Sequence, residues 1–365
     1  MFSINKCSSY EYSEVKKSLD ICLNKLGGLN KFIKKEDTVL IKPNLLMPAD
    51  PSLAITTHPI IVKILLKKLK NIGCKVIIAD SSSGYYTYEC MMKVYKECGY
   101  SNFKEINTDF SSKEYSNAKG FIKKYDLISA FFKADKIINV CKVKTHMFTT
   151  MTCATKNLFG LIAGKNKTYF HSRFKTVDDF SKMLVDLALV ANPCINIADG
   201  ILGMEGEGPS RGKIKKLGLI AASTNCFELD YNLSKIISID YKKIPYLNIA
   251  KTKGLFKENN NDYLEFKTPF KMPNSELISR LFRLIPSRLR SMYTDFFVKK
   301  PFIKDNCIGC GLCVKSCPVK AISLKKGKAH IDYSKCIRCY CCHEICRHNA
   351  IELRKGKVMN NFLKQ

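Results

Sequence analysis

The stretch CIGCGLCVKSCPVKAI (residues 307–322) places four cysteines in the pattern C-x2-C-x2-C-x3-C and follows the fourth with a proline. Residues 307–328 align with residues 336–357 at a constant offset of 29, without a gap. The alignment matches Cys307, Cys310, Cys313 and Cys317 with Cys336, Cys339, Cys342 and Cys346, and it also matches Ala321 with Ala350 and Ile322 with Ile351. The pattern therefore predicts a duplication in which each copy is a thiolate loop, a short helix and a strand.

The spacing of these cysteines predicts two iron–sulfur clusters. Three thiolates in C-x2-C-x2-C surround one [4Fe-4S] cluster, and the fourth, displaced onto the helix, reaches the neighbouring cluster. We therefore expect the copies to exchange ligands. Cys307, Cys310, Cys313 and Cys346 are predicted to hold one cluster, and Cys336, Cys339, Cys342 and Cys317 the other. The sequence from about residue 301 to 358 closely resembles bacterial two-cluster ferredoxins, which implies electron transfer.

Two positions depart from the ferredoxin pattern. Arg347 follows Cys346 where a proline is expected, and Cys341 is a ninth thiol at the position that corresponds to Leu312. We expect the amide and the charge of Arg347 to interact with the nearby cluster and to raise its potential, and Cys341 to be a bystander. Zinc is the alternative metal, but four-thiolate zinc sites usually come from paired C-x2-C knuckles.

The whole chain has the composition of a globular protein. Of its 365 residues, 46% are hydrophobic and 25% are charged, and the length predicts two or three domains. The start has no apolar run of signal-peptide type and no run approaches a membrane span, which favours a cytoplasmic protein. Nine further cysteines are scattered singly before residue 300, where small buried hydrophobic side chains are expected.

The net charge of +29 predicts anionic partners without choosing among them. The basic residues are mostly lysines spread along the chain, and no helix-turn-helix, RNA-recognition or zinc-finger pattern focuses them. This distribution favours a solvated basic surface over nucleic-acid binding. We expect a soluble, acidic redox partner and a small anionic ligand.

Composition along the chain predicts four regions: an α/β domain (1–254), a polar connector with a basic amphipathic segment (255–300), the ferredoxin-like domain (301–358) and a tail (359–365). Residues 276–300 combine six basic and two acidic residues with apolar residues at helical spacing. We expect this segment to pack against one of the domains. Contact with an anionic membrane surface, or with an acidic electron donor, is the alternative.

Apolar runs such as TVLI (38–41) and KVIIAD (75–80) alternate with helix-like stretches from Asp37 onward. This alternation predicts a mostly parallel sheet with both faces covered, that is, an α/β domain. Ligands of such sheets bind beyond the carboxyl ends of the strands. Polar residues follow four of the apolar runs: Lys42 and Asn44, then Asp80, Ser81 and Ser82, then Lys144 and His146, and then Asp199 and Glu205 in a glycine-rich loop.

The lysines at this edge predict an anion site. Lys42, Lys144 and Lys156, with the hydroxyls and amides of Ser81 to Ser83 at a predicted helix start, would hold a phosphate or a carboxylate. A structural alternative is that Asp80 and Ser81 are only turn and N-cap residues.

Two histidines are the predicted acid–base groups. His58 and His146 would act as acid, base or metal ligand, and Lys144 and His146 are the predicted catalytic residues. Carboxylate partners would come from Asp80, Asp199 and Glu205. The alternative for His58 is an incidental surface position beside Thr56 or Thr57, either of which would cap the helix that begins at Pro59.

Six motifs make residues 37–250 resemble the family catalogued as domain of unknown function 362, which is often fused to iron–sulfur modules. They are IKPNLL (41–46), TTHP (56–59), ADSSSG (79–84), KVKTH (142–146), TKNLFGLI (155–162) and ADGILGMEGEGP (198–209). The resemblance implies the α/β fold and the location of the site.

The expected function is electron transfer between two [4Fe-4S] clusters and a ligand or substrate on the α/β domain, as in an oxidoreductase. GMEGEG (203–208) lacks the order of a dinucleotide fingerprint, and no Walker loop is present. Electrons leave such clusters one at a time, which suits an additional flavin, a metal centre or a reductively activated substrate. The alternative is a ferredoxin-like carrier or docking protein whose large domain binds a partner and performs no chemistry.

Overall fold

The computed structural model describes residues 1–164, 166–174, 176–273 and 299–354. The chain forms two compact units. One comprises Met1–Lys167 and Thr176–Lys271, and the other Thr168–Lys175 and Met272–Gln365. Most of the predicted amphipathic segment (276–298) and the predicted tail (359–365) lie outside the described residues. Among the described residues, no helix is both long and apolar enough to span a membrane.

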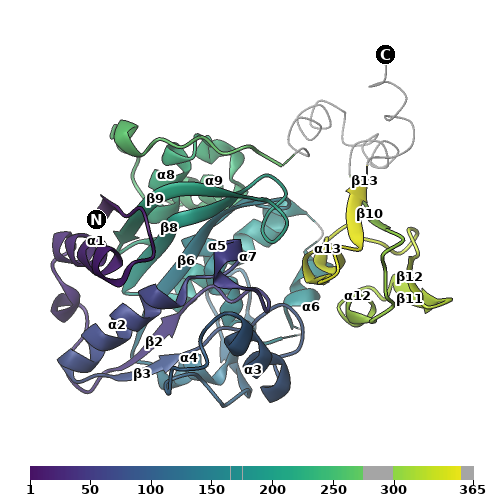
Figure 1. Cartoon of the computed structure of the whole chain (residues 1–365), viewed down its shortest axis with the longest axis horizontal. Coiled ribbons are helices and arrows are strands. Elements are labelled where there is room, and N and C mark those ends of the chain that lie inside the picture. The colour runs from purple at the N-terminus through teal and green to yellow at the C-terminus, as the bar shows by residue number, and fades with distance from the viewer. Residues whose placement is uncertain (165, 175, 274–298, 355–365) are drawn as a thin grey trace. The chain divides into compact units, whose positions relative to one another are not determined.

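The first unit is built on a seven-stranded sheet with the order β1-β9-β8-β6-β2-β3, in which β7 also pairs with β6 (Figure 1). Four strands run parallel: β2 (Thr38–Lys42), β3 (Lys75–Ile78), β6 (Lys136–His146) and β8 (Ile195–Glu205). Three are antiparallel to their neighbours: β1 (Phe2–Lys6), β7 (Thr150–Thr152) and β9 (Lys213–Ser223). The predicted mostly parallel α/β sheet is thus confirmed.

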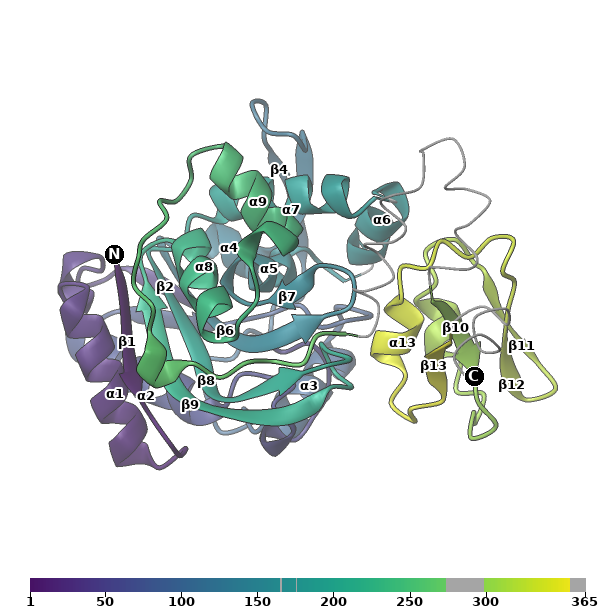
Figure 2. The same ribbon diagram turned by 90° about the horizontal axis from the view of Figure 1, so that it is seen from above.

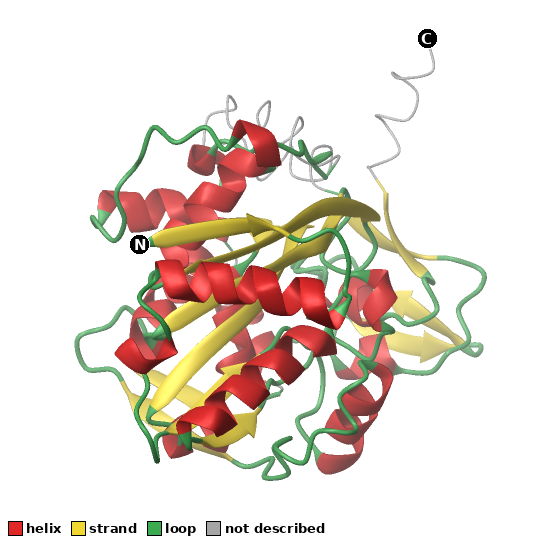
Figure 3. Ribbon diagram, turned by 60° about the vertical axis from the view of Figure 1, so that its left-hand side comes forward, coloured by secondary structure: helices red, strands yellow, loops and turns green. Residues whose placement is uncertain are grey.

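Helices cover both faces of this sheet, as the sequence predicted. On one face lie α1 (Tyr12–Lys25), α2 (Pro59–Ile72) and α3 (Tyr88–Glu97), whose buried residues join those of the strands in the main core. Figure 3 shows two of these helices side by side across the strands. The other face carries α5 (Ala154–Asn157), α7 (Val177–Ala191), α8 (Cys226–Ile236) and α9 (Pro245–Thr252) (Figure 2).

Shorter elements complete the described chain. A hairpin of β4 (Ser112–Ser116) and β5 (Lys124–Ile128) precedes α4 (Ser129–Lys133), and α6 spans Asn166–Arg173. Asp186 on α7 ties the hairpin to the helix layer, because its carboxylate accepts hydrogen bonds from Tyr125 and from the amides of Phe121 and Ile122.

Local sequence explains where α2 begins and ends. Pro59 occupies its first turn, His58 is the N-cap, and Gly73 closes it with φ +91°, a backbone conformation that glycine adopts without strain. The Nδ1 atom of His58 accepts from the amide of Ile60 at 3.3 Å. The cap is therefore His58, whereas the hydroxyl of Thr57 accepts from the amide of Asn44 at 2.9 Å.

The second unit contains two copies of a helix and a strand pairing. Its helices are α12 (Leu312–Lys315) and α13 (Cys341–Ile345), and its two sheets pair β10 (Lys300–Ile303) with β13 (Ile351–Arg354) and β11 (Ile322–Lys325) with β12 (Lys328–Ile331). Ile322, Ile331 and Ile351 form a small core together with Cys313 and Cys342. These features are those of the predicted ferredoxin-like domain.

A ladder of buried asparagines crosses the first unit. Asn139 and Asn196 lie opposite each other on β6 and β8, and the amide of Asn139 donates to Asn196 Oδ1 at 2.8 Å. Asn157 donates to Asn139 Oδ1 at 2.8 Å, and Asn44 donates to Asn157 Oδ1 at 2.9 Å. The ladder thereby fixes α5 and the segment after β2 to the centre of the sheet.

We predict that Asn139→Ala lowers the free energy of unfolding by about 2 to 3 kcal/mol, because it removes the buried donor to Asn196 Oδ1 and the closest acceptor of the Asn157 amide. The loss would be measured by urea unfolding followed by far-ultraviolet circular dichroism. Asn248→Ala, at an exposed position of α9, is the matched control and should change stability by less than about 0.5 kcal/mol. Equal stability of the two variants would show that the ladder contributes nothing.

Candidate functional site

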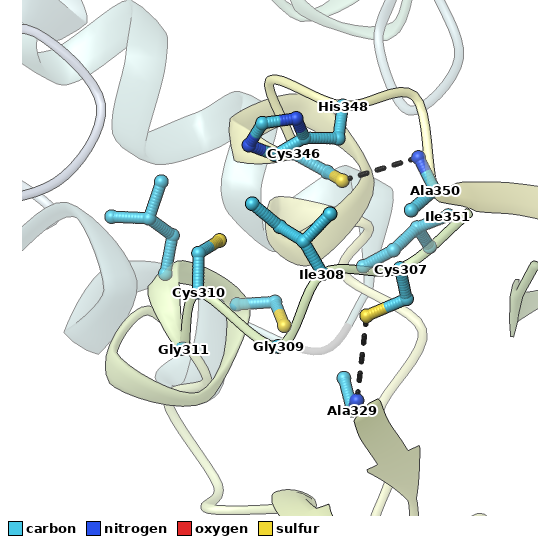
Figure 4. A pocket seen from close by; sticks show the side chains of 12 residues that line it. Cys307, Ile308, Gly309, Cys310, Gly311, Ala329, Cys346, His348, Ala350 and Ile351 are labelled. Atoms are coloured by element: carbon cyan, nitrogen blue, oxygen red, sulfur yellow. Dashed lines mark hydrogen bonds between the residues drawn. The ribbon is translucent and has the colours of Figure 1, made fainter. Parts of the chain in front are cut away.

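Four of the predicted cluster ligands line a single cavity in the second unit. Cys307, Cys310 and Cys313 come from the first copy, and Cys346 comes from the second (Figure 4). The cavity holds about 350 Å³ of space that no protein atom fills, part of it open solvent. The structure thus brings together the thiols of both copies that ligand exchange requires, and their donor chemistry fits a [4Fe-4S] cluster.

The other four predicted ligands also gather. Burial raises the pKa of Cys342 well above its ordinary value, and the neighbouring thiols of Cys339, Cys336 and Cys317 raise it further.

Within the described part of the chain, no three His, Cys, Asp or Glu side chains form a group that could hold one metal ion. A zinc ion would need thiolates at about 2.3 Å from the metal, whereas an iron–sulfur cluster is a larger body.

Backbone amides donate to cysteine sulfurs in both copies. The amide of Ala321 lies 3.1 Å from Cys317 Sγ, and the equivalent amide of Ala350 lies 3.3 Å from Cys346 Sγ. The amide of Ala329 lies 3.4 Å from Cys307 Sγ, as the dashed line in Figure 4 shows. Such bonds stabilise thiolates and tune the reduction potential of a cluster.

The two departures from the ferredoxin pattern lie outside the cavity lining. Arg347 is exposed to solvent. Cys341 contacts the carbonyl of its neighbour Cys339 at 4.0 Å through its sulfur. The predicted effect of Arg347 on a potential stays a prediction.

Lys42 and Asp80 form a buried ion pair at the carboxyl ends of β2 and β3. The Nζ atom of Lys42 lies 2.7 Å from Asp80 Oδ1 and 3.0 Å from the carbonyl of Pro43. Asp80 also accepts from the amides of Leu45 at 2.6 Å and Ser81 at 3.0 Å. Burial lowers the pKa of Lys42, and the charge of Asp80 opposes that shift.

A second buried ion pair joins Lys142 to Asp199, with 2.9 Å between Nζ and Oδ2. Lys142 also donates to the hydroxyl of Tyr10 at 2.7 Å, and that hydroxyl donates to Asp199 Oδ1 at 2.9 Å. The half-buried ring of His58 stacks on Tyr10, with 3.8 Å between ring centroids. Burial lowers the pKa of His58; Asp199 opposes this shift and Lys142 adds to it.

The predicted catalytic residues are buried within a strand. The Nζ atom of Lys144 donates to Asn44 Oδ1 at 2.9 Å and to the carbonyl of Ile55 at 2.6 Å. The Nδ1 atom of His146 accepts from the amides of Phe148 at 3.0 Å and Thr149 at 3.3 Å. In this arrangement Lys144 secures the segment after β2, and His146 holds the turn between β6 and β7.

Glu205 is the last residue of β8 and follows Met204, which pairs with Lys144 on β6. Its carboxylate accepts from the amide of Lys271 at 2.9 Å. Its predicted role as a partner of the histidines stays a prediction.

Lys167 is a residue of this edge that sequence reasoning missed. Its Nζ atom donates to the carbonyl of Ser81 and, at 3.1 Å, to that of Ser82. Burial lowers the pKa of Lys167 to about 7; Asp80 opposes the shift, while Lys42 and Lys156 add to it. Lys156 itself lies half-buried on α5, with its Nζ atom 5.7 Å from the ring centroid of Phe159.

Three local expectations were wrong. The serines after β3 do not begin a helix, since α3 starts only at Tyr88, so helix amides do not form an anion cradle there. Residues 142–146 continue β6, because Lys142 pairs with β8 and residues 144–146 pair with β7, and residues 199–205 continue β8 because they pair with β9. The signal that would have found Lys142 is the alternation in KVKTH, which places Lys142, Lys144 and His146 at every second position.

Glycine is required where the chain passes over the first ion pair. A Cβ atom at Gly160 would lie 1.9 Å from Asp80 Oδ1 and 2.6 Å from Lys42 Nζ. The carbonyl of Gly160 accepts from the amide of Ser81 at 2.9 Å, which sets this close approach. The backbone at Gly160 therefore lies directly against the Lys42–Asp80 pair.

We predict that Gly160→Ala lowers the free energy of unfolding by about 1 to 3 kcal/mol, because the added methyl group displaces the Lys42–Asp80 pair. Urea unfolding of Gly160→Ala, Asp80→Ala and the double variant would measure the coupling. The double variant should lose less than the sum of the single losses, since the nearest clashing atom is then absent. Strict additivity would contradict this account.

Comparison with known proteins identifies both units. A family model described as "Domain of unknown function (DUF362)" matches residues 39–234, and one described as "4Fe-4S dicluster domain" matches residues 306–356. The second match confirms the predicted [4Fe-4S] clusters and the resemblance to two-cluster ferredoxins.

One curated relative and one solved structure extend the comparison. The chain is 30% identical over 318 residues to the "Thylakoid-associated protein sll1697" of Synechocystis sp., covering 83% of this chain and 96% of that protein. It also resembles the lactate racemase apoprotein from Thermoanaerobacterium thermosaccharolyticum, at 15% identity and a TM-score of 0.42, with 64% of this chain and 56% of that chain covered. The chain thus spans little more than half of that enzyme. The matched models and the curated relative show that this chain belongs to the DUF362 family.

Proposed function

We propose that the chain is an iron–sulfur oxidoreductase in which the dicluster unit exchanges electrons with a small anionic ligand at the carboxyl edge of the α/β sheet. One observation carries the proposal: Lys42, Lys142 and Lys144 are all fully buried at that edge. Burying an ammonium group costs free energy even when it is paired, and apolar residues of similar volume are often at least as stabilising. Clusters of such groups are therefore typical of sites that bind or transform a ligand.

Lys156 and Lys167 supply the charge that attracts an anion at this edge. Lys42 and Lys142 are already paired with the carboxylates of Asp80 and Asp199. Lys156 and Lys167 are half-buried, and each influences the other electrostatically, so their ammonium groups lie in one field. A phosphate or carboxylate near both would lower their mutual repulsion.

Lys167 also supplies a proton at the pH of a cell. With a pKa of about 7, its amine is partly protonated near neutrality and can give or take a proton at Nζ. The [4Fe-4S] clusters supply electrons one at a time when bound. Proton transfer from Lys167 would then neutralise charge that develops on a ligand as it is reduced. A soluble acidic electron donor and a cytoplasmic location belong to this proposal.

We predict that the affinity for sulfate, a dianion of constant charge between about pH 6 and about pH 8, falls as the pH rises through about 7. The protonated form of Lys167 is the one that attracts an anion, so binding is lost with its proton. Isothermal titration calorimetry of the full chain would measure the affinity.

Two variants separate charge from structure in this test. Lys167→Arg stays protonated and should bind sulfate without the fall near pH 7, whereas Lys167→Gln should bind about tenfold or more weakly than the unaltered protein near pH 6 and show no fall with rising pH. An unchanged pH dependence in Lys167→Arg would remove Lys167 from the site.

The identity of the ligand can be tested on the anaerobically purified protein. We predict about eight iron atoms per chain together with a small anion or organic cofactor, detected by metal analysis and by mass spectrometry of the released molecules. Iron and sulfide alone, with no anion binding, would favour the alternative of an electron carrier whose large unit docks a partner. Iron far below this number would contradict both functions.

A further inference from the structure

The two cysteine loops of the second unit differ in how they are covered. In the first loop, glycines stand at positions 309 and 311, and the equivalent positions of the second loop hold Arg338 and Tyr340. All four residues have positive φ, a conformation that costs glycine nothing and costs other residues free energy. Arg338 and Tyr340 are therefore under backbone strain in the second loop, and their side chains occupy positions where the first loop has none.

Tyr340 is a buried anchor of the second loop. It is buried, its hydroxyl donates to the carbonyl of Lys299 at 3.0 Å, and the thiols of Cys336, Cys339 and Cys342 lie near enough to raise its pKa, although burial is the largest cause of that shift. Tyr333 adds a second anchor, with its hydroxyl 2.9 Å from the carbonyl of Pro301. Both aromatic side chains of the second copy are thus tied by hydrogen bonds to the backbone at residues 299–301, at the start of β10.

The first loop is open instead. Ile308, beside Cys307, is 63% exposed, and Cys310 is also exposed to solvent. Both line the cavity that the first set of ligands surrounds, and Figure 4 shows them among its lining side chains. A cluster held there would lie close to the surface, where electron exchange with another protein is fastest.

A lysine-rich turn stands directly beside this opening. A Cβ atom at Gly309 would lie 2.2 Å from the carbonyl of Gly327, so the first loop rests on the turn between β11 and β12. That turn presents Lys325, Lys326 and Lys328, all exposed, and Leu324 beside it is 49% exposed. We call the surface formed by Ile308, Leu324, Lys325, Lys326 and Lys328 the loop-1 face.

The charge of the unit indicates what covers the loop-1 face. Residues 299–354 contain twelve Lys and Arg residues but only four Asp and Glu residues. An apolar centre beside a group of like charges is typical of a transient protein interface, in which opposite charges guide the encounter. The matching partner is therefore an acidic electron-carrier protein.

We propose that an acidic one-electron carrier protein docks on the loop-1 face and exchanges electrons through the cluster held by Cys307, Cys310, Cys313 and Cys346. This inference rests on the proposed electron-transfer function and adds the point of entry and the chemistry of the partner. One electron passes between the carrier and that cluster: the donor centre is oxidised by one electron, the acceptor cluster is reduced by one, and no atom or proton is transferred.

The test uses the full chain with both clusters and an acidic plant-type [2Fe-2S] ferredoxin as the probe. Electron paramagnetic resonance titration first gives the potentials, and freeze-quench spectra then follow exchange in the direction that those potentials make downhill. Lys325→Glu, Lys326→Glu and Lys328→Glu together should slow exchange at low salt roughly tenfold or more and reduce its dependence on ionic strength. Reduction by dithionite, which needs no docking protein, should be unchanged.

A charge-matched control comes from the other unit. Lys17→Glu, Lys63→Glu and Lys67→Glu together change the net charge equally at exposed positions of α1 and α2 and should leave the exchange rate within about twofold. Ile308→Ala tests the apolar centre and should slow exchange at high salt as well. Each variant must show the cluster spectrum of the unaltered protein, which reports that the cysteines still hold their clusters.

The outcomes separate this inference from the function on which it rests. Equal exchange rates for the loop-1 variant and the unaltered protein would overturn the docking face. The same result is expected if the α/β unit of the same chain covers that face, and it overturns the proposal in that case too. Failure of ferredoxin to exchange electrons with a protein that dithionite reduces would also overturn it and leave the iron–sulfur function standing. The absence of any [4Fe-4S] signal in the unaltered protein would overturn both.

Discussion

A buried ammonium group needs a carboxylate or several acceptor oxygens around it, and this requirement organises the carboxyl edge of the sheet. Lys42 on β2 pairs with Asp80, which follows the neighbouring strand β3, and Lys142 on β6 pairs with Asp199 on the neighbouring strand β8. Lys144, two residues beyond Lys142 on β6, is held by Asn44 and by a backbone carbonyl. Because each partner comes from a different strand or loop, the lysines also lock the segments that surround the candidate site.

The sequence predicted the parts of the fold that depend on local pattern. The α/β class follows from the alternation of apolar runs with helices, and the dicluster domain follows from eight cysteines at fixed spacing. The full lengths of β6 and β8 could not be predicted, because their last residues are strands only through pairing with β7 and β9. Tertiary hydrogen bonding thus overrides the polar, glycine-rich composition of those segments.

The candidate site was predicted in its location but not in its contacts. Lys42, Asp80 and Ser81 do lie together, yet the partners of Lys142 are Tyr10 and Asp199, which lie 132 and 57 residues away along the chain. Lys167 was missed because it lies in a polar helix and contacts the site through the backbone carbonyls of Ser81 and Ser82. Chemistry that arises from such long-range contacts leaves no signature in local sequence.

The cavity of the first loop also constrains how the protein is made. Three of its cysteines lie within seven residues, whereas Cys346 belongs to the other copy and is translated later. During synthesis the first loop therefore passes through a stage with three thiols and no fourth. A cluster held by these four thiols would be completed only after the second copy is made, so the duplicated halves, which look like independent modules in the sequence, would mature as a single unit.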